Sequence, residues 1–94
     1  FSNVEKVGGL LKSGLIKIVN DFPNIFTEVR GRGLMLGIKA KIPRIGVVEK
    51  LRENGLLTSP AEDNVVRITP PLIIEKKHVR EAIEIIRKTV KELT

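Results

Sequence analysis

The sequence contains no cysteine, tryptophan or tyrosine, and a single histidine among its 94 residues. Without cysteine, disulfides and thiolate metal sites are excluded, and one histidine is too few for a His-rich metal site. The only aromatic residues are Phe1, Phe22 and Phe26, so the core has to be aliphatic. No apolar run approaches the roughly 18 residues that span a bilayer, and no signal-peptide pattern opens the chain. We therefore expect a soluble, cytoplasmic protein with no membrane partner and no bound metal.

The length allows one domain and lies below the usual size of about 100–150 residues. Hydrophobic residues make up 41% and charged residues 30% of the chain, which is ordinary for a globular domain. Residues 1–94 are accordingly predicted to form a single domain. Because the chain starts at Phe1 in what reads as the approach to a helix, we expect it to be a piece of a longer protein.

The formal net charge of +6 raises the possibility of a nucleic-acid partner. In the last segment, however, acidic residues are interspersed among the basic ones, which is typical of a solvated helix face. Aromatic side chains on which bases could stack are also scarce. A basic nucleic-acid binder is therefore the least favoured interpretation, and no nucleic acid is expected as a partner.

Apolar residues at spacings of three and four predict a first helix. It should end near Asp21, because Pro23 disfavours a helical residue before it. The apolar stripe of this helix consists of Val4, Val7, Leu11, Leu15, Ile18 and Phe22. Segments 25–30 and 34–40 then read as two strands, joined by a tight turn over Gly31-Arg32-Gly33.

A second helix is predicted after Pro43, with Asn54-Gly55 as its C-terminal stop. Residues 56–59 and 65–69 read as strands separated by a turn over 60–64. A final amphipathic helix should run from about residue 75 to 93. The resulting order is α-β-β-α-β-β-α, and we expect an α+β fold in which a small antiparallel or mixed sheet carries helices on one face.

Groups that could act in catalysis are scarce. His78 lies off the apolar stripe of the last helix, so it is expected to face solvent. Glu53, Glu62 and Asp63 lie at a helix end and in a turn, where carboxylates commonly accept hydrogen bonds from backbone N–H groups. Ser59 has neither an elbow motif nor a histidine near it in sequence. The sequence therefore assigns no catalytic residue.

Arg67 is the one candidate binding residue. In a strand, successive side chains point to opposite faces, so Arg67 should leave the core if Val66 and Ile68 enter it. A guanidinium on a stiff strand is well placed to bind a carboxylate through two parallel hydrogen bonds. Periodicity alone favours the plainer interpretation, an arginine in a cross-strand ion pair.

Three segments resemble the C-terminal region of class III aminotransferases, and the acetylornithine and ornithine aminotransferases in particular. They are residues 29–38 (VRGRGLMLGI), 53–60 (ENGLLTSP) and 63–72 (DNVVRITPPL), and they occur in the family's order. The resemblance covers nearly the whole chain. It implies the C-terminal small domain of a type I pyridoxal-phosphate enzyme, in which an arginine at the position of Arg67 holds the carboxylate of the amino-acid substrate.

The resemblance further implies pyridoxal 5'-phosphate as cofactor, a homodimeric full-length enzyme, and amino transfer between acetylornithine and 2-oxoglutarate in arginine biosynthesis. The family's cofactor-binding residues belong to a large domain, and no motif in these 94 residues matches them. We therefore expect this piece to bind no cofactor and to be inactive alone, with the large domain of the same chain as its partner. The main alternative is a free-standing α+β module that binds a small molecule or another protein.

Overall fold

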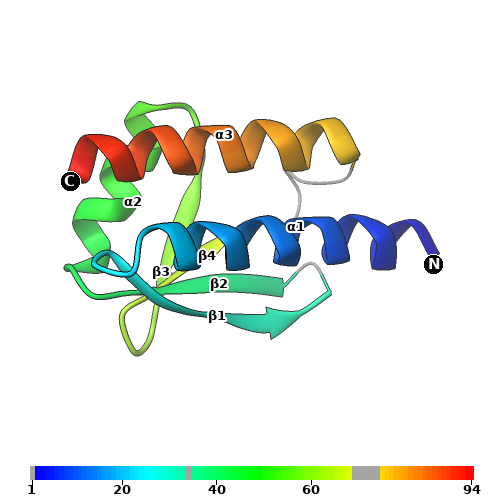
Figure 1. Cartoon of the computed structure of the whole chain (residues 1–94), viewed down its shortest axis with the longest axis horizontal. Coiled ribbons are helices and arrows are strands. Elements are labelled where there is room, and N and C mark those ends of the chain that lie inside the picture. The colour runs from blue at the N-terminus through cyan, green and yellow to red at the C-terminus, as the bar shows by residue number, and fades with distance from the viewer. Residues whose placement is uncertain (1, 34, 69–74) are drawn as a thin grey trace.

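A computed structural model describes residues 2–33, 35–68 and 75–94 of the chain (Figure 1). Its elements are α1 (Ser2–Asp21), β1 (Phe26–Arg32), β2 (Met35–Ala40), α2 (Arg44–Glu53), β3 (Thr58–Ala61), β4 (Val65–Ile68) and α3 (Lys76–Leu93). This order confirms the predicted α+β class. None of the helices described is long and apolar enough to cross a bilayer.

The strands form one antiparallel sheet in the order β1-β2-β4-β3. The helix α1 lies along β1 and β2, α2 packs against β3 and β4, and α3 packs against both other helices (Figure 1). One face of the sheet is thus turned toward the helices. We call the other face the open face; it carries Arg30, Gly37, Lys39 and Arg67.

The core lies between the sheet and the helices and is almost entirely aliphatic. The prediction from the apolar stripe of α1 is confirmed, since Val7, Leu11, Leu15 and Ile18 are all buried. Val4 of this stripe lies outside the residues whose burial is described. The sheet contributes its alternate side chains to the same core: Leu36, Ile38, Ala40, Val66 and Ile68.

The strand limits differ from the prediction, chiefly in β1 and β3. The strand β1 continues through Gly31 and Arg32, which pair with Leu36 and Met35, so the three-residue turn was placed too early. Gly31 adopts a φ of +102°, and a Cβ there would overlap the carbonyl oxygen of Met35. The third strand is Thr58–Ala61 rather than residues 56–59, because its pairing with β4 spans these residues. Pro60 and Ala61 therefore belong to the strand and not to the predicted turn. Residues 69–74, including the predicted end of β4, lie outside the described part.

Asn64 joins three elements of the fold. Its side-chain nitrogen donates to the carbonyl oxygens of Ala40 at 2.7 Å and Ile42 at 2.8 Å. Its side-chain oxygen accepts a 2.8 Å hydrogen bond from the backbone N–H of Arg44, the first residue of α2. Pro43 at the N-cap position makes no side-chain cap, so Asn64 supplies the cap from a distant turn. This single side chain therefore fixes the β3–β4 turn against the end of β2 and the start of α2.

Candidate functional site: an arginine on the open face

Arg67 projects from an interior strand of the sheet. Its neighbours Val66 and Ile68 are 1% and 0% exposed in the core, whereas Arg67 itself is exposed. The prediction that Arg67 leaves the core is thus confirmed. Backbone pairing on both sides, with Gly37 of β2 and Ser59 of β3, holds this position rigidly.

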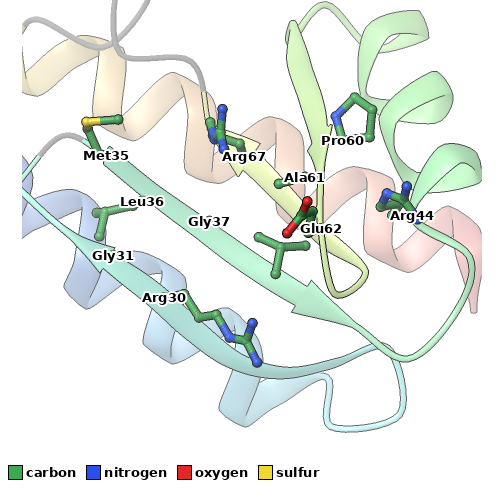
Figure 2. A pocket seen from close by; sticks show the side chains of 11 residues that line it. Arg30, Gly31, Met35, Leu36, Gly37, Arg44, Pro60, Ala61, Glu62 and Arg67 are labelled. Carbon is green, nitrogen blue, oxygen red and sulfur yellow. The ribbon is translucent and has the colours of Figure 1, made fainter.

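A wide depression of about 680 Å³ lies beside Arg67 on the open face. Figure 2 shows side chains from β1, β2, β4, the β3–β4 turn and the start of α2 around it. Three of the lining residues are arginines, namely Arg30, Arg44 and Arg67, and one is acidic, Glu62. Because its charged lining groups are mostly guanidinium, the depression favours an anionic ligand.

Arg30 is already bound to acidic side chains. Its guanidinium lies 3.0 Å from a carboxylate oxygen of Glu28 and 2.6 Å from one of Asp63, and Lys39 lies 3.2 Å from the same Asp63 oxygen. Hydrogen bonds that Arg30 donates, first to Glu28 and then to Asp63, raise the pKa of Arg30. Hydrogen bonds, first from Arg30 and then from Lys39, lower the pKa of Asp63. The charge of Arg30 is therefore largely compensated by its neighbours.

Arg67 differs from Arg30 in this respect. Among residues 2–33, 35–68 and 75–94, no acidic side chain forms an ion pair with Arg67. The cross-strand ion pair that periodicity alone favoured is thus not observed there. Arg44, at the start of α2, likewise lines the depression without an acidic partner in the described chain, and its Nε is buried without a hydrogen bond. The arrangement can bind a carboxylate.

The other sequence candidates do not assemble into a catalytic set. Glu53 lies 3.5 Å from Lys50 in a salt bridge on α2, and Asp63 belongs to the Arg30 cluster. His78 is half-buried, so the expectation that it faces solvent is met only in part, and its Nδ1 has no hydrogen-bond partner among the described residues. No group of three or more potential metal ligands occurs in the described residues.

Two features of the site were missed in the sequence. The cluster around Arg30 depends on Asp63 in the β3–β4 turn, which is 33 positions away in the chain and reaches it only through strand pairing. For Asn64 the sequence predicts only a turn. In the structure, Asn64 and Asp63 adopt positive φ angles of 57° and 59°. Two consecutive Asx residues are a sequence signal for positive φ angles, since Asn and Asp are among the non-glycine residues that most often adopt them.

Comparison with known proteins gives one consistent result. Residues 1–90 match the family model described as aminotransferase class-III. The acetylornithine aminotransferase of Brucella melitensis is 39% identical over 92 residues, which are 98% of this chain and 23% of that protein. The chain thus spans about a quarter of the length of such relatives.

Solved structures agree with the sequence matches. The ornithine aminotransferase from Plasmodium yoelii superposes with a TM-score of 0.86 at 40% identity, over 98% of this chain and 25% of that one. The acetylornithine aminotransferase from Elizabethkingia anophelis superposes with a TM-score of 0.85 at 33% identity, over 96% and 24%. The arrangement of helices and sheet described above therefore recurs within much longer chains.

Proposed function

Because the chain belongs to the class-III aminotransferase family, we propose that residues 1–94 form the C-terminal, substrate-side small domain of a pyridoxal-phosphate-dependent transaminase. In this proposal the large cofactor-binding domain is another part of the same polypeptide, and the small domain is inactive alone. The proposal is supported by the share of each relative that the chain spans, 23% to 25%.

The role proposed for this domain is to bind the carboxylate of the amino-acid substrate through Arg67. The observation that carries the proposal is the contrast between two arginines on one face: Arg30 is paired with two acids, and Arg67 with none in the described chain. A planar guanidinium binds a carboxylate through two parallel hydrogen bonds. Held on a paired strand, Arg67 would fix the substrate's orientation, which is a contribution to positioning rather than to bond making.

The residues around the depression do not fit the cofactor itself. The cofactor, when bound, supplies the electron sink for amino transfer, and it requires a lysine amine for its imine linkage. Among the described residues that line the depression there is no lysine and no aromatic ring. We therefore assign pyridoxal 5'-phosphate to the large domain, and to this chain only the binding and orientation of the substrate.

For the substrates we propose acetylornithine as amino donor and 2-oxoglutarate as acceptor, which would place the enzyme in arginine biosynthesis. The support is the name of the relatives, several of which are acetylornithine aminotransferases. Relatives named ornithine aminotransferase are similarly close, at 42% identity in one case. We further propose a homodimeric, cytoplasmic enzyme.

The test is steady-state kinetics of the full-length enzyme with Arg67→Lys. A lysine keeps the charge but cannot form two parallel hydrogen bonds, so we expect KM for the amino donor to rise by roughly tenfold or more. Arg52→Lys, on the exposed side of α2, is the matched control and should leave KM unchanged. Unchanged donor kinetics in Arg67→Lys would remove this residue from the site.

A further inference from the structure

A glycine occupies the middle of the open face. The strand register places Arg30, Gly37, Arg67 and Ser59 in one row across β1, β2, β4 and β3. Residues directly opposite one another in antiparallel strands have Cβ atoms about 4.5–5.5 Å apart. No side chain of β2 therefore lies between the two arginines, and Gly37 itself is buried.

The backbone does not require glycine at this position. Gly37 lies inside a strand and is not among the glycines with positive φ, which are Gly31, Gly33 and Gly55. A glycine inside a strand also weakens the strand, because it loses more conformational freedom on folding than other residues and packs no side chain. The glycine is therefore explained by the space that a side chain at position 37 would need.

A Cβ at position 37 would have little room on the side of Val65, whereas the depression lies on its other side. A Cβ built on Gly37 would lie 2.6 Å from Cγ1 of Val65 and 3.1 Å from the carbonyl oxygen of Val66. It would lie 3.6 Å from the Cα of Arg67. Both Gly37 and Val65 line the depression beside Arg67. Any larger side chain at 37 would project into the depression, over the approach to the guanidinium.

We propose that Gly37 is a specificity-determining residue, which forms the floor of the carboxylate site and sets how much bulk next to the carboxylate the site accepts. This inference rests on the proposed role of Arg67. The ligand class is an amino acid or 2-oxo acid whose carboxylate binds Arg67 and whose adjacent carbon lies against Gly37 and Val65, which both line the depression. Arg30, which is ion-paired with Glu28 and Asp63, also lines the depression.

The test compares carboxylates of increasing bulk as competitive inhibitors of the full-length enzyme with respect to the amino donor. The probes are acetate and pivalate, and the variants are Gly37→Ala and Gly37→Ala combined with Val65→Ala, which removes the Cγ1 atom that the new Cβ would meet. We expect both variants to weaken inhibition by pivalate at least about fivefold more than inhibition by acetate. A purely structural role would change both inhibition constants by the same factor.

Gly46→Ala is the matched control, because a Cβ at this exposed position of α2 meets nothing within 4 Å. It should leave both inhibition constants unchanged. An unchanged ratio of the two constants in the folded double variant would overturn the role of Gly37, whereas the Arg67→Lys result independently decides the role of Arg67. If Gly37→Ala unfolds the enzyme and Val65→Ala does not rescue it, Gly37 serves packing and the proposal is also overturned.

Discussion

The two faces of the sheet are built from the same four strands, but they differ in exposure to solvent and in charge. Toward the helices, Leu36, Ile38, Val66 and Ile68 are at most 1% exposed and belong to the hydrophobic core. On the open face, the positions between them hold charged residues and a glycine (Figure 2). Alternation along each strand is what separates the two sets.

Within a single strand, the residues expected to stabilise the fold thus differ from the residues proposed to bind a ligand. Burial of apolar area stabilises the fold roughly in proportion to the area removed from water, so the helix-covered face should carry most of the stability. The open face contributes charges that are partly solvated, and exposed ion pairs stabilise little. Substitutions on this face can therefore alter ligand binding while the fold persists.

The sharpest test of the contrast uses adjacent residues of β4. Ile68→Ala creates a cavity at a fully buried position, and we expect a loss of about 2–5 kcal/mol in the free energy of unfolding. Arg67→Ala removes an exposed side chain, and the expected change is within about 0.5 kcal/mol. Urea unfolding followed by circular dichroism measures both. Similar losses for the two variants would mean that the open face is also part of the core.

Asn64 joins the β3–β4 turn to the end of β2 and the start of α2, and its removal should have the next largest effect. Asn64→Ala leaves two backbone carbonyl oxygens and one helix N–H without their partner, so we expect a loss of about 2–3 kcal/mol. Asn64→Asp keeps an acceptor for the N–H of Arg44 but places a carboxylate against the two carbonyl oxygens. It should therefore be destabilised as well, and a wild-type unfolding midpoint for Asn64→Asp would contradict the proposed donor role.

The smallest expected effect concerns Asp63 on the open face. Its folded-state pKa is lowered from the ordinary value of 3.8, mainly by Arg30, so its contribution to stability is present above that value. The contribution is lost as the pH falls through 3.8 and then through the lower folded-state pKa. Asp63→Asn should consequently be slightly less stable than the wild type at pH 7 and equal to it in strong acid. Unfolding midpoints measured across the acid range check this; a difference that persists below both pKa values would exclude a titration effect.

Much of the helix-covered face could be predicted from the sequence, because periodicity is a local property. The spacing of Val7, Leu11, Leu15 and Ile18 gave both the helix and its buried side. The same logic placed Arg67 outside the core, since Val66 and Ile68 on either side of it are apolar. Neither inference needed knowledge of which strands pair.

The open face could not be predicted in the same way, because its contacts join distant segments. The ion pair of Arg30 with Asp63 and the position of Gly37 between two arginines both depend on the pairing of β1, β2 and β4. A three-residue glycine-flanked turn was the natural hypothesis for residues 31–33, yet the strand pairs further, through Arg32. Pairing of this kind is set by tertiary packing rather than by local propensity.

The most direct measurement is a crystal structure of the full-length enzyme with a non-reactive analogue of the amino donor bound. The account predicts that the analogue's carboxylate lies against Arg67, with two N–H···O distances of about 2.7–2.9 Å. The adjacent carbon should lie above Gly37. A carboxylate bound away from the open face, with Arg67 paired to an acidic side chain of the large domain instead, would contradict it.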